Sequence, residues 1–245
     1  MNDLIIIKLG GNAATQLTPA FFTQLKAWHA AGQHLLLIHG GGPQINAWSA
    51  KMGLHAHKLA GIRVTDPATL AVTQAVLLGL VQPTLCQAIA QAGLPVIGLN
   101  TTDEQLLVGE YLDQHQYGEV GQVTAVNAAY LHDMLRHHVG VLAPLAQTTQ
   151  GQMLNVNADM AAASIAQALH PAKLILLTDV PGVLRDGAVM PSVTTGELAE
   201  LIRAEVITSG MQPKVNAAAT GAQSGASVVI TDDLTHPGTE IRIAG

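Results

Sequence analysis

The sequence predicts an α/β fold in three layers, an αβα sandwich whose central, mainly parallel sheet lies between two layers of helices. Short apolar runs rich in Val, Leu and Ile alternate along the chain with longer segments that carry helix caps. The runs are continuous rather than alternating in polarity, which is typical of strands buried on both faces of a parallel sheet. Parallel strands need crossover connections, so helices should cover both faces.

The first hundred residues predict three buried strands and three helices. Thr18 and Asp66 each precede a proline, the pattern of an N-cap followed by a first helical residue. Residues 67–102 contain no charged residue but are interrupted by glutamines and Pro83, so we expect a buried helix and strand rather than a membrane span. The expected elements are strands at 4–9, 35–38 and 94–99 and helices at 19–32, from 43, and 67–93.

From residue 105 onward, the sequence first predicts more polar strands than those of the first hundred residues. Alternating buried strands and helices then follow. Segments 105–112 and 119–126 are more polar and partly alternating, which favours a hairpin or an edge sheet. Thr194 and Glu197 have the spacing of a capping box. We expect one domain over 1–245 with a soft division near 145–157, containing helices at 127–138, 157–169 and 213–224 and strands at 139–143, 173–178 and 228–230.

Composition excludes several classes of protein. The 245 residues include 11 Lys+Arg and 17 Asp+Glu, giving a net charge of −6, and 49% are hydrophobic. Disorder is excluded by this hydrophobicity, and nucleic-acid binding lacks the required excess of cations. The single cysteine, Cys86, excludes an intramolecular disulfide and a cysteine-based zinc site. The scattered histidines show no metal-binding spacing, and the N-terminus lacks the basic region of a signal peptide, so we expect a cytoplasmic protein without a resident metal.

Known nucleotide-binding and hydrolase motifs are missing from the sequence. There is no G-x-x-x-x-G-K-[ST] loop, no G-x-G-x-x-G after a strand, no G-x-S-x-G and no H-E-x-x-H. Instead, glycine-rich or polar clusters follow four of the predicted parallel strands, at the sheet edge where α/β proteins bind ligands. These clusters are 8–11, 39–42, 99–103 and 178–182.

Lys8 is the most informative of the residues in these clusters. It ends a strand of isoleucines just before Gly10 and Gly11, and a buried lysine is costly unless an anion pairs with it. Paired glycines let backbone N–H groups approach an anion, and the helix at Pro43 adds its positive end behind Gly40–Gly42. The alternative is a tight turn with a lysine that reaches solvent. Two such turns beside a cation favour a phosphate site.

Other polar residues extend this hypothesis to an acidic substrate. Arg63 could hold a carboxylate with two hydrogen bonds, or pair with Asp66. Residues 155–159 present two asparagines and Asp159 at a helix start, where an N-cap role explains only Asn157. Lys214 enters the first turn of a helix, where a cation opposes the helix dipole unless an anion is bound.

Six segments taken together resemble the amino acid kinase family. They are 8–11, 39–42, 61–66, 153–159, 178–183 and 210–215, and they occur in this order along the whole chain. The resemblance implies an αβα sandwich whose N-terminal half (about 1–150) binds an acyl amino acid and whose C-terminal half (about 151–245) binds ATP. It further implies phosphorylation of the side-chain carboxylate of N-acetyl-L-glutamate, a step of arginine biosynthesis, with Mg²⁺ carried by the nucleotide.

The resemblance also implies a role for individual residues. Lys8 and Lys214 would flank the moving phosphoryl group, and Asp159 would hold both ammonium groups. Backbone N–H groups of Gly10, Gly11 and Gly41 would bind phosphate oxygens. The acyl amino acid would contact Gly41, Gly42, Arg63, Asn155 and Asn157, and the ATP pocket would be lined by Asp179, Val180, Pro181, Gly182, Val183, Leu184, Val206, Ile207 and Thr208.

Some features leave alternatives open. N-acetyl-aminoadipate differs from N-acetylglutamate by one methylene, worth only about 1–3 kcal/mol in a pocket. A catalytically silent amino-acid or nucleotide sensor would share the fold, although Lys8, Lys214 and Asp159 are all present. The segment 100–104 replaces the Gly-Asp-Gly turn usual in the family. The short sequence before Lys8 lacks the N-terminal helix of arginine-inhibited hexamers, so the resemblance implies a homodimer without arginine feedback.

Overall fold

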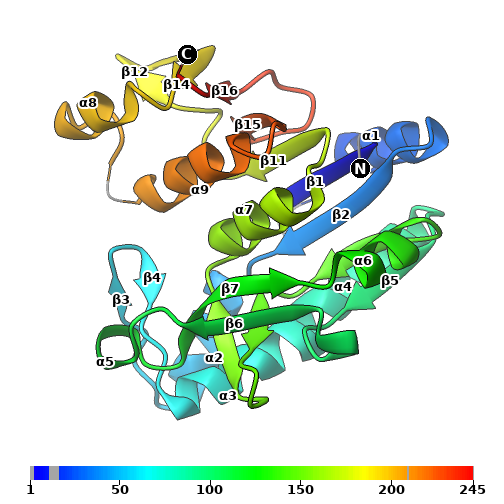
Figure 1. Ribbon diagram of the computed structural model, residues 1–245, viewed down its shortest axis with the longest axis vertical. Coiled ribbons are helices and arrows are strands. Elements are labelled where there is room, and N and C mark those ends of the chain that lie inside the picture. Colours follow the sequence, from blue (N-terminus) through cyan, green and yellow to red (C-terminus); the bar gives the residue numbers. More distant parts are fainter. Residues whose placement is uncertain (1–2, 11–16, 209, 245) are drawn as a thin grey trace.

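The computed structural model describes residues 3–10, 17–208 and 210–244, and within them an αβα sandwich is seen (Figure 1). The main helices are α1 (Pro19–Ala30), α2 (Gly42–Lys51), α3 (Pro67–Val76), α4 (Gln82–Gln91), α5 (Gln114–Tyr117), α6 (Ala128–Leu135), α7 (Ala158–Leu169), α8 (Leu198–Arg203) and α9 (Gln212–Ala222). The central sheet contains β14 (Ser192–Thr194), β16 (Thr239–Arg242), β15 (Ser227–Thr231), β11 (Lys173–Leu177), β1 (Leu4–Leu9), β2 (His34–His39), β8 (Val139–Leu142) and β5 (Val96–Leu99), in this spatial order.

The central sheet is parallel except where β16 runs antiparallel to β15. Strand β1 lies in the middle and pairs with β2 on one side and β11 on the other. The carboxyl ends of β1, β2 and β11 therefore meet at one edge of the sheet. The predicted mainly parallel sheet is confirmed, and this edge is where the glycine-rich turns are placed.

Alternate residues of β1 enter two separate cores on opposite faces of the sheet. Leu4 and Ile6 belong to the core that α6, α7 and α9 cover, whereas Ile5 and Ile7 belong to the core that α1 to α4 cover. The segment Pro67–Gln91 is long and apolar enough to cross a membrane by length and composition alone, with a mean hydropathy of 1.5. Here it packs Val76, Leu85 and other apolar residues onto the sheet, as the predicted buried helix requires.

Four of the nine α-helices named above begin at predicted caps. Side-chain oxygens of Thr18, Asp66, Asn127 and Asn157 accept hydrogen bonds from the first turns of α1, α3, α6 and α7. The long helix contains an unpredicted π-helical turn, η1 (Leu77–Val81), between α3 and α4. The expected capping box is wrong in part, because the Thr194 hydroxyl donates to the Glu197 carboxylate and α8 begins only after Glu197.

The predicted middle hairpin is confirmed, and it forms part of a small closed unit. Strands β6 (Leu107–Tyr111) and β7 (Val120–Val126) pair antiparallel, and a short 3₁₀ turn, η2 (Asp103–Gln105), precedes them. Strands β9 (Leu145–Gln147) and β10 (Met153–Val156) close the unit, with β10 parallel to β7. This unit orients the start of α7. Two further hairpins are β3 (Lys58–Leu59) with β4 (Ile62–Arg63), and β12 (Leu184–Arg185) with β13 (Ala188–Val189).

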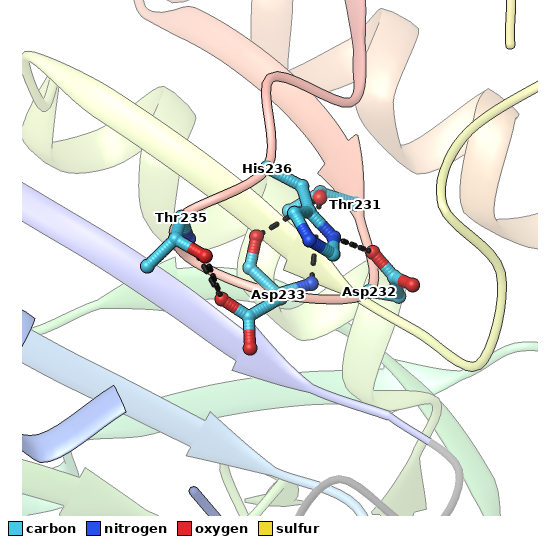
Figure 2. Close-up of polar contacts among 5 residues, drawn as sticks. All are labelled: Thr231, Asp232, Asp233, Thr235 and His236. Atoms are coloured by element: carbon cyan, nitrogen blue, oxygen red, sulfur yellow. Dashed lines mark hydrogen bonds and ion pairs between the residues drawn. The ribbon is translucent and has the colours of Figure 1, made fainter. Parts of the chain in front are cut away.

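The loop between β15 and β16 is held by its own side chains (Figure 2). The Asp233 carboxylate accepts hydrogen bonds from the backbone N–H and hydroxyl of Thr235 at 2.8 and 2.7 Å, and His236 Nδ1 lies 2.8 Å from Asp232 Oδ1. This hydrogen bond and the Asp232 charge raise the pKa of His236. The loop leads to Thr239, whose hydroxyl accepts from Val183 N–H at 2.8 Å. The C-terminal strand is thereby tied to the segment that follows β11.

Candidate active site

A cavity of about 450 Å³ opens at the carboxyl edge of the central sheet. The ends of β1 and β2 and the beginnings of α2, α7 and α9 surround it. We call it the lysine cavity, because three lysines line it. Its lining residues are Lys8, Gly10, Gly40, Gly41, Gly42, Pro43, Asn46, Lys58, Gly61, Asn157, Ala158, Asp159, Asp179 and Lys214.

A buried ion pair forms the floor of the lysine cavity. Lys8 Nζ lies 2.7 Å from Asp159 Oδ1, and the two side chains are only 4% and 7% exposed. Lys8 comes from the end of β1 and Asp159 from the first turn of α7, where a carboxylate also favours the helix dipole. The pair holds an ammonium group in a place where an unpaired charge would be strongly unfavourable.

Lys214 provides a second, half-buried ammonium group from the first turn of α9. Burial is the largest effect on the pKa of Lys214 and lowers it, and the nearby Lys8 and Lys58 charges lower it further. Asp159 and Asp179 act in the opposite direction and raise that pKa. The cluster thus holds three cations against two carboxylates, a local excess of positive charge that suits a bound anion.

Backbone groups from two glycine-rich turns complete the cavity. Gly10 follows Lys8 so closely that a Cβ there would collide with the Lys8 ammonium group and lie 2.9 Å from Leu177 O. Gly41 lies against η1, where a Cβ would be 2.8 Å from Leu77 Cδ2. The turn containing Gly41 and Gly42 leads directly into α2, so the positive end of this helix faces the cavity. Gly11 lies outside the described residues.

A smaller pocket of about 130 Å³ shares Gly40–Gly42, Lys58 and Gly61 with the lysine cavity. We call it the arginine pocket, because Arg63 lines it. Ile45 and Leu77 give it apolar walls, so it combines two cations, Lys58 and Arg63, with aliphatic surface. An acidic molecule in this pocket would extend toward the lysine cavity past the shared glycine turn.

Arg63 is buried without a carboxylate partner among the described residues. Its guanidinium donates to Asn46 Oδ1 at 2.6 Å and to Gly42 O at 3.3 Å, while the other terminal nitrogen has no hydrogen-bond partner there. Burial lowers the pKa of Arg63. The alternative of an ion pair with Asp66 is wrong, because the Asp66 carboxylate caps α3 at Thr69 N–H, 2.6 Å away. The free guanidinium nitrogen is suited to a ligand carboxylate.

The two predicted asparagines line the arginine pocket in different ways. Asn155 is buried and its amide donates to Thr65 Oγ1 at 3.0 Å. The Asn157 carbonyl oxygen accepts from Asp159 N–H and Met160 N–H, so the expected N-cap role is confirmed. Its amide nitrogen remains for the cavities that the residue lines.

The nine residues expected to line an ATP pocket are spread over different environments. Asp179 is exposed and lines the lysine cavity. Val183 and Ile207 are buried in the core below the surface, at 0% and 1% exposure. Val180, Pro181 and Val206 are half-buried, Gly182 is buried beneath Thr239, and Leu184 and Thr208 are exposed. Of these nine residues, Asp179 is the one that lines the lysine cavity among the described residues.

Sequence reasoning missed Lys58 and Asn46, which line the lysine cavity. Lys58 lies only five positions before Arg63, and this closeness in sequence was the signal that could have indicated it. Conversely, the predicted cluster at 99–103 lies beyond the lining of both cavities. It follows β5, the outermost strand of the sheet, where a turn is remote from β1. Among the described residues, no group of three His, Cys, Asp or Glu side chains could hold a metal ion.

Comparisons with known proteins agree with this architecture. The model of the amino acid kinase family matches residues 3–232. An acetylglutamate kinase from Lactiplantibacillus plantarum is 51% identical over 98% of both chains. A solved structure from Streptococcus mutans has a TM-score of 0.94 at 38% identity, covering 99% of both chains. Carbamate kinase from Giardia lamblia shares the fold, with a TM-score of 0.70, 19% identity and complete coverage of both chains. The chain belongs to the amino acid kinase family.

Proposed function

We propose that this chain transfers the γ-phosphoryl group of ATP to the side-chain carboxylate of N-acetyl-L-glutamate, a step of arginine biosynthesis. The observation that carries this proposal is the joining of the lysine cavity and the arginine pocket through one glycine turn. The first collects cations suited to a phosphoryl group, and the second offers a buried guanidinium to a carboxylate. The 51% identity with an acetylglutamate kinase over nearly the whole chain supports the same activity.

Lys8 and Lys214 are assigned to the phosphoryl group during transfer. Both ammonium groups face one cavity, from β1 and α9 respectively, so the transferring oxygens can lie between them. Asp159 holds Lys8 in place through the 2.7 Å ion pair. Backbone N–H groups of Gly10, Gly11 and Gly41 are assigned to phosphate oxygens. Lys58 adds further positive charge to the cavity.

The acyl amino acid is assigned to the arginine pocket. Its α-carboxylate would accept from Arg63, whose second terminal nitrogen has no partner among the described residues. Gly41, Gly42, Asn155 and Asn157 would contact the rest of the molecule. The side-chain carboxylate would then point past the glycine turn toward Lys8.

The chemistry needs no general base, because a carboxylate nucleophile is already ionised at pH 7. The one histidine beside the glycine turn, His39, is unsuited to that role because it is fully buried and burial lowers its pKa to about 4. Catalysis would rest on in-line positioning and on stabilising charge at the transferring group. Mg²⁺ would arrive with ATP and bridge its phosphates, as this ion commonly does.

We further propose that the halves of the chain divide the two substrates. Residues up to about 150 supply Arg63 and the glycine turn at 40–42, and residues from about 151 supply Asp159, Asp179 and Lys214. ATP would extend from Lys214 over the segments 179–184 and 206–208. The Thr239 hydroxyl fixes the segment 179–184, because it accepts a hydrogen bond from Val183 N–H and donates one to Met190 O.

A cytoplasmic homodimer without arginine feedback is the proposed form of the enzyme. The long helical segment Pro67–Gln91 contains no charged residue, and Leu80 on it is 40% exposed. The helical segment packs on the sheet, and β5 is an edge strand of that sheet, so we assign both to the contact with a second copy. Sedimentation showing a hexamer, or inhibition by arginine, would contradict this part of the proposal.

The test is ATP-dependent acyl-phosphate formation trapped with hydroxylamine. N-acetylglutamate, glutamate and N-acetyl-aminoadipate are compared for wild type, Lys8→Ala and Lys214→Ala, with Lys26→Ala on the exposed face of α1 as the matched control. We expect turnover on N-acetylglutamate that falls roughly 100- to 1000-fold in both cavity variants and stays unchanged in the control. Faster turnover on N-acetyl-aminoadipate than on N-acetylglutamate would make N-acetyl-aminoadipate the assigned substrate. Tight ATP binding without turnover on any acid would favour a sensor.

A further inference from the structure

The β3–β4 hairpin connects the two cavities to the helix that carries Lys214. Lys58 begins the hairpin in the lysine cavity and Arg63 ends it in the arginine pocket. Its two-residue turn, Ala60-Gly61, has φ values of +49° and +81°. Figure 1 shows the turn projecting toward the beginning of α9. The turn therefore reaches from the N-terminal half to an element of the C-terminal half.

The Gly61 end of the turn faces the Pro213 side chain. A Cβ at Gly61 would lie 2.9 Å from Pro213 Cγ and 3.7 Å from its Cδ, and no other atom outside the turn lies within 4 Å of that position among the described residues. On one side of the turn is the lysine cavity, and on the other a cavity of about 430 Å³ with an uncharged lining. The Pro213 ring therefore lies between the two cavities, at the place where a side chain on Gly61 would have to go.

Pro213 is the chain neighbour of Lys214 and shares its helical turn. The proline ring has no side-chain rotamers to absorb a displacement, so movement of Gly61 must move the first turn of α9 or open the contact. A carboxylate bound at Arg63 would restrain the other end of the same two-residue strand, β4. Ligand binding in the arginine pocket is thus connected to Lys214 through a short, stiff path.

We infer that the Gly61–Pro213 contact positions the Lys214 ammonium group when the arginine pocket is occupied, which makes Gly61 and Pro213 positioning residues. This inference rests on the proposed function of Lys214. It gives the hairpin a second role besides carrying Lys58 and Arg63. It also explains why the turn uses a glycine where any side chain would collide with the proline ring.

The kinetic test compares Gly61→Ala with a matched control that has the same backbone strain but no neighbour. Gly53 has φ +73° and no atom within 4 Å of its Cβ position, so Gly53→Ala reports strain alone. We expect Gly61→Ala to lower kcat at least 10-fold with less than a 3-fold change in KM for ATP, and Gly53→Ala to leave kcat unchanged. In a Pro213→Ala background, adding Gly61→Ala should lower kcat by less than 3-fold. Equal losses in both backgrounds would overturn the inference.

A labelling test separates this inference from the proposed activity. The rate at which an acylating reagent modifies Lys214 is measured by mass spectrometry relative to exposed Lys26, with and without N-acetylglutamate. We expect at least 3-fold protection of Lys214 in wild type and none in Pro213→Ala, while calorimetry still detects N-acetylglutamate binding in both. Protection that survives in Pro213→Ala would mean direct shielding and would overturn the inference, as would absence of protection in wild type. Protection without turnover would reject only the proposed function.

Discussion

His39 makes the stability of the glycine turn sensitive to acid. It ends β2 immediately before Gly40–Gly42, and its side chain is fully buried. Nδ1 donates to Gly40 O at 2.9 Å, and the buried Nε2 has no hydrogen-bond partner among the described residues. Burial lowers the pKa of His39 from 6.5 to about 4, and the hydrogen bond to Gly40 opposes only part of this effect. In the folded protein the His39 imidazole is therefore neutral at pH 7.

The sign and size of the effect follow from this pKa difference. In the unfolded chain His39 binds a proton near pH 6.5, whereas in the folded chain it binds one only near pH 4. Its contribution to the free energy of unfolding is complete above pH 6.5 and is lost as the pH falls from 6.5 to about 4. One pKa unit corresponds to about 1.36 kcal/mol, so the whole difference corresponds to about 3 kcal/mol.

Urea unfolding measured from pH 7.5 to pH 4.5 tests this reasoning. His39→Gln removes the titrating group and keeps an amide that can donate to Gly40 O, and exposed His115→Gln is the matched control. Between pH 7.5 and pH 4.5, the free energy of unfolding of wild type and of the control should fall by about 2–3 kcal/mol more than that of His39→Gln. Parallel curves for all three proteins would refute the reasoning. So would an imidazole resonance of His39 that titrates near pH 6.5 in the folded protein.

Four further predictions concern the site and its supports. Arg63→Lys should raise KM for N-acetylglutamate roughly 10- to 100-fold with little change for ATP, because an ammonium cannot replace a two-pronged guanidinium contact; unchanged KM would remove Arg63 from the acyl site. The kcat of wild type should decline as the pH rises through the lowered pKa of Lys214, since only the protonated form is cationic, and Lys214→Arg should lose this decline in its pH–rate profile. Asp159→Asn should destabilise the fold by about 3–5 kcal/mol in urea unfolding by leaving Lys8 buried without its partner, and Lys8→Met in the same chain should recover part of the loss. Asp66→Ala should cost about 1 kcal/mol of unfolding free energy through the lost cap of α3, without changing KM for either substrate.

The elements and site residues that could be predicted depend on local or strongly patterned signals. Helix starts could be predicted at Thr18, Asp66 and Asn157, because a capping side chain bonds to backbone groups only a few residues away. Lys8 and the glycine turn at 40–42 could be placed together because parallel strands bring their carboxyl ends to one edge. Arg63 and Asn155 were candidates from their residue types and positions, the family resemblance assigned them to the acyl amino acid, and both line one pocket.

Features that depend on distant pairings or unusual backbone could not be predicted. The closed unit of β6, β7, β9 and β10 requires β10 to pair in parallel with β7, and nothing in the short, mixed-polarity segments specifies that partner. Lys58 was missed because the hairpin around it has two-residue strands and turns through Ala60 at φ +49°, where Asn, Asp or Gly is usual. The π-helical turn at Leu77–Val81 contains Gly79 and precedes Pro83, which lacks the N–H for an α-helical hydrogen bond, but these two residues indicate an irregularity without specifying its π form.

The central position of β1 has a consequence for how the protein is made. β1 precedes the other described strands in the chain and so leaves the ribosome before them, and β2 can pair with it after a connection that contains α1. Its other edge pairs with Lys173–Leu177, so that edge remains open until most of the chain has been synthesised. Lys8 meets Asp159 only when α7 has also been added. Assembly of the ion pair is therefore a late folding event with a large loop-closure cost, and β1 is a strand that a nascent chain must protect from pairing with other molecules.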